Sequence, residues 1–143
     1  MVTASTKLRE IAEQSGSDPR GALMRAVGDV SGYEPFHNLI LVATYVAPEK
    51  TKGGIIRVDR TLAEDRFQGK VGLVLKVGPI AFTDDNSTKF GGVKVKPGEW
   101  VTYRASDGME MFFVDPNGRD GTPCRVLEDV HIKGRLDDPS MIY

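Results

Sequence analysis

Residues 69–78 read Gly-Lys-Val-Gly-Leu-Val-Leu-Lys-Val-Gly. Apolar side chains occupy every second position of this stretch, as Val71, Leu73, Leu75 and Val77, and they alternate with Lys70, Gly72, Val74 and Lys76. Successive side chains of a strand point to opposite faces of a sheet, so a period of two predicts a β-strand with one buried face.

Further short strands are predicted on both sides of this one. An apolar run rich in β-branched residues covers residues 39–46, and Val93 and Val95 alternate with lysines before a turn at Pro97-Gly98. Three more short strands are predicted over residues 100–103, 111–114 and 125–127. Short strands separated by turns are typical of a small barrel or sandwich, so the predicted fold class is mainly β.

Two long polar or charged stretches, residues 47–69 and 79–92, interrupt the predicted strands. Loops of this length without secondary structure are uncommon in a compact domain and are usually functional. We therefore expect the function of the chain to lie in these two loops.

The first 32 residues differ in kind, because their apolar residues follow a helical spacing. Leu8, Ile11 and Ala12 suit one short amphipathic helix, which Ser15-Gly16-Ser17 would end. Asp18-Pro19 has the form of an N-cap followed by proline at the first helical position, and an apolar stripe follows it at Leu23, Ala26, Val27 and Val30. Helices this short are marginal alone, so they must pack on another element if this segment is not a partly disordered leader.

Composition restricts the function classes. The chain has 143 residues, 19 basic and 20 acidic side chains, a formal net charge of −1 and one cysteine. The near-neutral charge argues against binding to nucleic acid or to an anionic membrane. No apolar run approaches the roughly 18–20 residues that span a bilayer, and residues 1–7 lack the apolar core of a signal peptide. We therefore expect a soluble protein of the reducing cytoplasm, without an internal disulfide.

Candidate catalytic or metal-binding groups are few. His37 and His131 have no partner at a metal-ligand spacing, and Cys124 follows a proline at the start of a predicted strand, where a buried inert thiol is expected. The acidic pairs Asp84-Asp85 and Asp137-Asp138 lack the further ligands of a calcium loop and are expected to be solvated turns. The sequence thus predicts no enzyme, no cofactor and no metal site.

The first long loop holds two isoleucines directly after two glycines, Gly53-Gly54-Ile55-Ile56, on a charged background. One interpretation is a short edge strand with its side chains in the core. The other is a flexible loop that presents an apolar hook to another protein. Each buried isoleucine would contribute about 1.5–3 kcal/mol, but ordering the loop would oppose much of this. One loop would therefore bind weakly, whereas a ring of several copies would bind tightly.

Five segments in order resemble the chaperonin-10 (GroES-type) co-chaperonin family. Residues 35–42 are similar to its opening strand motif, residues 51–56 to its mobile loop and residues 69–78 to its strand that ends in Ala-Val-Gly. Residues 93–101 resemble its Val-Lys-x-Gly-Asp-x-Val segment, and Glu128-Asp129-Val130 stands at its closing Ser-Asp-Ile. The second long loop takes the place of its roof hairpin.

This resemblance implies a small irregular GroES-like β-barrel with two long loops and a short N-terminal helical extension. The expected parts are an extension over residues 1–34, a barrel over 35–134 and a tail over 135–143. The family forms a homo-oligomeric ring of seven subunits, which caps a GroEL-type double-ring chaperonin with ATP and encloses non-native substrate proteins. The resemblance assigns chaperonin binding to Gly53, Gly54, Ile55, Ile56 and Val58.

The sequence also departs from the family pattern. Arg57 replaces a third apolar residue of the hook, Asn38-Leu39 replaces an Asp-Arg pair, and residues 59–68 form a longer and more charged stretch than usual. The N-terminal extension has no counterpart in the cellular family. These differences suggest a virus-encoded relative, in the host cytoplasm or the virion. The alternative function is a viral capsid or tail assembly protein that keeps the barrel without chaperonin docking.

Overall fold

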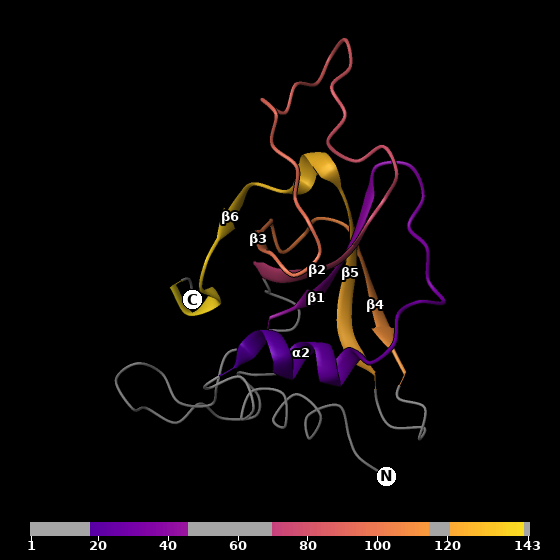
Figure 1. The fold of residues 1–143 in the computed structure, drawn as a ribbon, viewed down its shortest axis with the longest axis vertical. Helices are drawn as coiled ribbons and strands as arrows, with labels where there is room; N and C mark the ends of the chain where they lie inside the picture. The colour runs from indigo at the N-terminus through magenta and orange to yellow at the C-terminus, as the bar shows by residue number, and fades with distance from the viewer. Residues whose placement is uncertain (1–17, 46–69, 115–120, 142–143) are drawn as a thin grey trace.

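The computed structural model describes residues 18–45, 70–114 and 121–141, and it contains one antiparallel sheet of six strands in the order β4-β5-β1-β2-β3-β6 (Figure 1). The strands are β1 (Leu39–Thr44), β2 (Val71–Val77), β3 (Trp100–Thr102), β4 (Met109–Phe113), β5 (Thr122–Glu128) and β6 (Gly134–Leu136). One α-helix, α2 (Pro19–Val27), and two 3₁₀ turns, η1 (Asp129–His131) and η2 (Pro139–Met141), complete the described elements. The predicted mainly β fold class is confirmed.

The sheet is curled but not closed. Strand β1 pairs with both β2 and β5, and the register of its pairing with β2 shifts between Leu41 and Val42. Strands β4 and β6 stand at the two edges of the described sheet and do not pair with each other. The expected barrel is therefore an open, strongly curved sheet in the described part of the chain.

The prediction that the strand over residues 69–78 has one buried face is wrong for its first half, because Val71, Gly72, Leu73 and Val74 are all buried. Two apolar clusters account for this. The α2 cluster includes Leu41, Ala43, Leu73, Trp100, Cys124 and Val126. The roof-side cluster includes Ile40, Val42, Val74, Val101, Leu127 and three residues of the segment after β2, namely Ala81, Phe82 and Val95. Each cluster covers one face of the strands.

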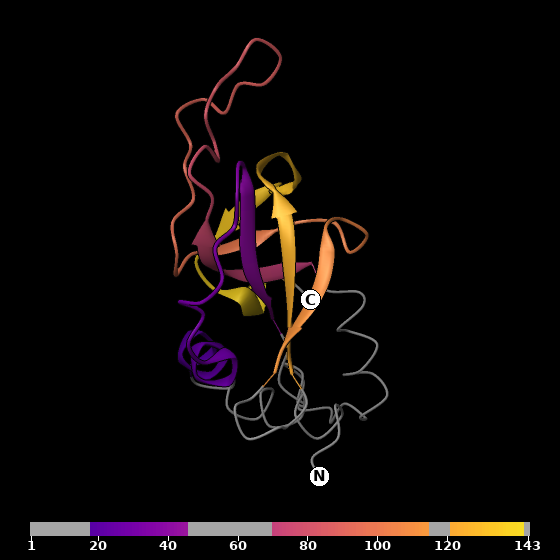
Figure 2. The same ribbon diagram turned by 90° about the vertical axis from the view of Figure 1, so that its right-hand side faces the viewer.

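Helix α2 forms as its sequence predicts. The carboxylate of Asp18 accepts a hydrogen bond from the Gly21 amide at 3.1 Å, and Pro19 occupies the first helical position. Leu23 and Val27 enter the α2 cluster, and the Thr122 hydroxyl donates to the Ala26 carbonyl at 2.9 Å. The helix is thus held on the sheet by packing, as a segment too short to be stable alone requires. Figures 1 and 2 show it at the end of the sheet opposite the projecting second loop.

Two details differ from the sequence-based prediction. Residues 93–96 do not form a strand. Val95 is buried but Val93 is 48% exposed, and the Val93 amide donates to Phe90 within a turn. Strand β6, in contrast, is not predicted by the sequence and pairs with β3, Val101 opposite Arg135.

The predicted helix over Leu8, Ile11 and Ala12 lies outside the described residues, so it stays a prediction. None of the described helices is long and apolar enough to span a bilayer.

Candidate functional site

The base of the first long loop is built from the ends of two paired strands. Strand β1 ends at Thr44, which pairs with Gly72 near the start of β2. One residue further, the Tyr45 amide donates to the Val71 carbonyl at 2.9 Å. The chain therefore leaves and re-enters the sheet at adjacent positions. The residues predicted to bind a chaperonin, Gly53, Gly54, Ile55, Ile56 and Val58, lie outside the described residues, between these two ends.

Buried aromatic side chains hold this base in place. The Tyr45 ring meets Trp100 edge to face, with ring centroids 5.6 Å apart, and Trp100 is buried. The Tyr103 hydroxyl donates to the Val71 carbonyl at 3.4 Å, and burial raises the pKa of Tyr103 to about 12. A Cβ on Gly72 would lie 3.0 Å from the Tyr103 ring. The loop base is thus part of the core, which fixes where the loop starts and ends.

The second long loop, residues 79–92, leaves from the other end of the same strand pair, where Ile40 pairs with Val77. Figures 1 and 2 show it projecting away from the sheet. Its root is tied to the start of β1, because the Gly78 amide donates to the Leu39 carbonyl at 2.7 Å and the Ile80 amide to the His37 carbonyl at 3.1 Å. A Cβ on Gly78 would lie 2.4 Å from the His37 carbonyl oxygen, so only glycine fits here.

A buried carboxylate joins three separate segments at this root. Asp129 is 5% exposed; its Oδ1 accepts from the Asn38 side-chain amide and its Oδ2 from the Phe82 backbone amide, both at 3.0 Å. Phe82 has a left-handed backbone, with φ of 61°, and packs edge to face on Phe90. Buried carboxylates are costly unless their oxygens are hydrogen-bonded, and both oxygens are used here. The Asn38 that replaces an acidic residue of the family motif therefore has a structural partner.

The acidic pair Asp84-Asp85 forms a turn, as predicted. The Asp85 carboxylate accepts from the Ser87 amide and hydroxyl and from the Thr88 amide, and these hydrogen bonds lower its pKa. Asp84 accepts from the Phe90 amide at 2.8 Å. Both carboxylates thus shape the loop that carries them.

Cys124 and His131, two of the residues considered as reactive or metal-binding groups, are held by packing or hydrogen bonds within the fold. Cys124 is buried in the α2 cluster, as expected, and desolvation raises its pKa to about 12. The Nδ1 of His131 accepts from the Glu128 amide at 3.0 Å. Within residues 18–45, 70–114 and 121–141, no group of three or more His, Cys, Asp or Glu residues is placed to hold a metal ion.

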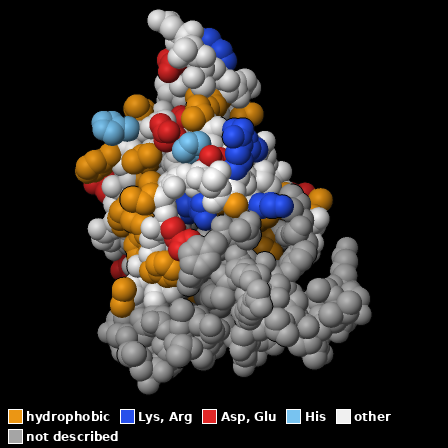
Figure 3. Space-filling view, turned by 180° about the vertical axis from the view of Figure 1, so that it is seen from behind, with side chains coloured by type: hydrophobic (Ala, Val, Ile, Leu, Met, Phe, Trp, Pro, Cys, Tyr) orange, Lys and Arg blue, Asp and Glu red, His pale blue; other side chains and the backbone are white. Residues whose placement is uncertain are grey.

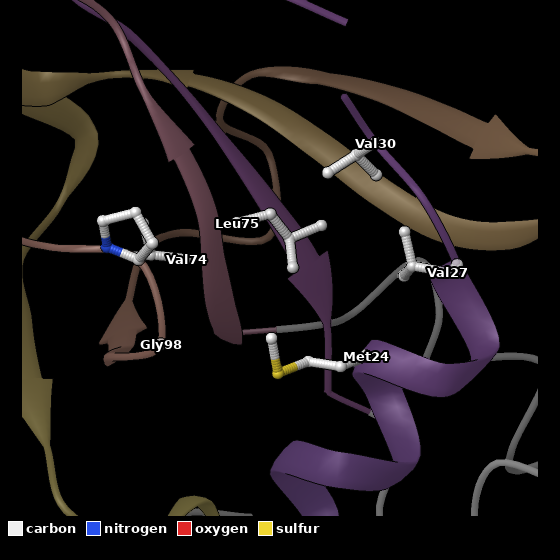
Figure 4. A pocket seen from close by; sticks show the side chains of 8 residues that line it. Met24, Val27, Val30, Val74, Leu75 and Gly98 are labelled. Carbon is white, nitrogen blue, oxygen red and sulfur yellow. The ribbon is translucent and has the colours of Figure 1, made fainter. Parts of the chain in front are cut away.

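An apolar hollow of about 220 Å³ lies between α2 and the middle of β2. Figure 4 shows Met24 and Val27 of the helix and Val30 on one side, with Val74, Leu75 and Gly98 on the other. Met24 is 51% exposed, so this junction is only partly sealed. Among the described residues that line the hollow, none carries a charged or catalytic side chain.

Two of the sequence motifs contain residues that fix the root of the second loop, but the sequence did not indicate what these residues contact. Gly78 and Asp129 stand in two of the motifs, yet their joint role in fixing the second loop depends on residues far away in the chain, since Asn38 and Asp129 are separated by 91 positions. No local pattern indicates such a link.

Comparison with known proteins agrees with this architecture. The family model described as the chaperonin 10 Kd subunit matches residues 32–125, which begin after α2. The co-chaperonin GroES of Hyphomonas neptunium is 32% identical over 103 residues, which cover 72% of this chain and 95% of the relative. The co-chaperonin GroES 2 of Mesorhizobium japonicum is 30% identical over 110 residues, which cover 77% of this chain and 94% of the relative. With these matches, the chain belongs to the chaperonin-10 family.

Proposed function

We propose that this protein is a co-chaperonin, a ring subunit that caps an ATP-driven GroEL-type chaperonin and assists the folding of non-native proteins. The observation that carries the proposal is the family match over residues 32–125, together with relatives that are co-chaperonins. These relatives favour a co-chaperonin over the alternative of a viral capsid or tail assembly protein. The proposed place of action is the cytoplasm, and the protein itself needs no catalytic residue or cofactor.

Docking is assigned to Ile55, Ile56 and Val58, with Gly53-Gly54 permitting the backbone to bend. The geometry of the loop base supports this assignment. Tyr45 and Val71 are hydrogen-bonded neighbours fixed to Trp100 and Tyr103, so the loop has a rigid platform at one end of the sheet. Because the base is fixed, the docking residues of each copy would start from the same position when several copies bind one chaperonin.

We infer from the family that seven copies assemble into a ring, and the open sheet supports a head-to-tail contact between copies. Strands β4 and β6 are unlike edges at opposite ends of the strand order. Met109, Phe112 and Val114, on or next to β4, are 59%, 42% and 69% exposed. A head-to-tail contact between two unlike surfaces generates a closed ring when the rotation closes. In such a ring the weak docking of each loop would be multiplied by effective concentration.

The proposed parts of the chain are an N-terminal extension over residues 1–34, a co-chaperonin domain over 35–134 and a tail over 135–143. The described α2 packs on the sheet, so the extension contributes to the same core as the domain.

The test is co-sedimentation of the full chain with a GroEL-type double ring, with and without ATP. We expect nucleotide-dependent binding by the wild type and its loss in Ile55→Asp. The matched control is Ile80→Asp, the same change at a 54% exposed isoleucine at the root of the other loop, which should still bind. Binding that survives Ile55→Asp would refute the hook assignment. No binding by the wild type to any chaperonin of its host would refute the co-chaperonin function.

A further inference from the structure

Arg125 is a buried cation in the middle of β5. It is 4% exposed, and it pairs with Val42 of β1 on one side and with Glu110 of β4 on the other. In Figure 3 the flank that carries β4, at the left of the view, is mainly hydrophobic, and the basic side chains in view lie away from it. The charge of Arg125 is thus held inside the fold, where a cation is costly unless its donors are hydrogen-bonded.

The contacts of Arg125 fix the segment between β3 and β4. Its Nη1 donates to the backbone carbonyls of Ala105 at 2.5 Å and Asp107 at 2.7 Å. Its Nη2 lies 3.9 Å from the carboxylate of Glu110, whose side chain is 22% exposed, and so long an ion pair beside solvent contributes little. Within the described part of the chain, the buried Nε has no hydrogen-bond partner. The bonds to the two carbonyls are therefore the main contacts, and they tie the turn after β3 to β5.

Tyr103 links Arg125 to the base of the first loop. The guanidinium carbon lies 5.5 Å from the centroid of the Tyr103 ring, within the range of a cation–π contact. The Tyr103 amide donates to the Lys70 carbonyl at 3.0 Å, and its hydroxyl donates to the Val71 carbonyl at 3.4 Å. The Val71 carbonyl also accepts from the Tyr45 amide. The contacts of Arg125 thus continue to the two points where the first loop leaves and re-enters the sheet.

What arginine provides at this place is a fixed geometry. A buried ion pair can often be replaced by apolar residues of similar size without loss of stability, so burial of a charge is a weak means of stabilising a fold. The guanidinium group is planar and rigid, and it can bind two carbonyls while it lies over an aromatic ring. A flexible apolar side chain offers none of these contacts, and the compact ammonium of lysine offers only part of them.

We propose that Arg125 is a positioning residue for chaperonin docking, which holds Tyr103 and the turn after it so that both ends of the first loop keep one geometry. The inference rests on the co-chaperonin function proposed above and adds a residue outside the docking loop. Arg125 is buried, so it acts through Tyr103 and does not touch the chaperonin itself. Because several loops dock together in a ring, a small loss in each loop is multiplied.

The first experiment measures hydrogen exchange at single backbone amides of the full chain by NMR. Arg125→Met removes the charge and the donors but keeps an unbranched side chain. We expect the Tyr45 amide, which donates to Val71, to exchange about tenfold faster in this variant. The Gly78 amide, which donates to Leu39 at the other end of the same strand pair, is the internal control and should exchange at the wild-type rate.

The second experiment measures docking by co-sedimentation of the full chain with a GroEL-type double ring and ATP. We expect the apparent dissociation constant of Arg125→Met to rise at least about tenfold. Arg125→Lys should restore part of the docking and part of the Tyr45 protection, because an ammonium can still donate to a carbonyl. The matched control is Asp129→Asn, which removes a buried charge at the root of the second loop and should dock as the wild type does.

The outcomes separate positioning from general stability. Equal acceleration at Tyr45 and Gly78, or an equal loss of docking in Arg125→Met and Asp129→Asn, would show general destabilisation and overturn the proposal. Wild-type docking by Arg125→Met would overturn it as well. If Arg125→Met does not fold, Arg125→Lys decides, and wild-type exchange and docking by that variant would refute the positioning role. A wild-type chain that binds no chaperonin would instead overturn the co-chaperonin function on which the docking role rests.

Discussion

Removing the largest α2 side chain in the core should destabilise the whole domain. Leu23 is fully buried and packs in one cluster with residues of β1, β2, β3 and β5. Leu23→Ala deletes three carbon atoms from this cluster, a loss of about 2.4 kcal/mol at about 0.8 kcal/mol per buried methylene. The cavity left behind adds to the loss, so we expect the free energy of unfolding to fall by about 3–4 kcal/mol.

The assay is urea unfolding followed by tryptophan fluorescence at one fixed protein concentration. The chain has a single tryptophan, Trp100, which is 2% exposed and lies in the same cluster as Leu23. Its emission therefore reports directly on the packing that the substitution disturbs. We expect a lower urea midpoint with an unchanged slope, because the surface exposed on unfolding is nearly the same.

Met24→Ala is the matched control on the same helix. Met24 is 51% exposed, so its truncation should cost less than about 1 kcal/mol. If Leu23→Ala and Met24→Ala lower the free energy of unfolding equally, or if neither changes it, α2 does not pack on the sheet in solution. The account of why both sheet faces are apolar would then be refuted.

Three further outcomes are expected. Gly78→Ala should lower the free energy of unfolding by about 2–3 kcal/mol, because the added Cβ would lie 2.4 Å from the His37 carbonyl oxygen. Thermal unfolding measures this loss. Gly32→Ala is the control, because a Cβ at Gly32 would have no atom within 4 Å. A thiol reagent at pH 8 should label Cys124 far more slowly in the native chain than in urea, since burial raises the pKa of this thiol to about 12; equal rates would refute its burial. The free energy of unfolding should also fall as the pH rises from about 10 to 12, because an unfolded tyrosine loses its proton near pH 10 whereas burial holds the pKa of Tyr103 at about 12. The raised pKa of the Cys124 thiol lowers the free energy of unfolding over the same pH range. The contribution of Tyr103 is therefore the part of this fall that is lost in Tyr103→Phe. If Tyr103→Phe has the same pH profile as the wild type, the assignment to Tyr103 is wrong.

Local chemistry made several elements predictable. The Asp18-Pro19 pair begins a helix because the carboxylate satisfies a helix-end amide and proline has no amide to lose. The Pro97-Gly98 turn forms as expected, with φ of 93° at Gly98, a conformation that glycine adopts without strain. These features depend on near neighbours in the chain, so the sequence contains the information that they require.

Other elements could not be predicted because they depend on distant partners. Residues 134–136 read Gly-Arg-Leu, with no alternation, and become a strand only because β3 offers an edge to pair with. Val93 and Val95 alternate with lysines as a strand would, yet their segment bonds within turns and no ladder forms. Periodicity indicates which side chains would share one face of a strand. It does not indicate whether a neighbouring strand is present to form the backbone hydrogen bonds.

By itself, the sequence determined the mainly β class, the helix that begins at Pro19, the loop that follows β2 and the order of motifs that indicates the chaperonin-10 family. Only the tertiary structure decided that both faces of the central strands are buried, that Tyr45 and Val71 close the base of the first loop, and that Asp129 ties Asn38 to Phe82. The physical reason is that burial and hydrogen bonding in a sheet join residues far apart in the chain. Such contacts exist only once the chain has folded.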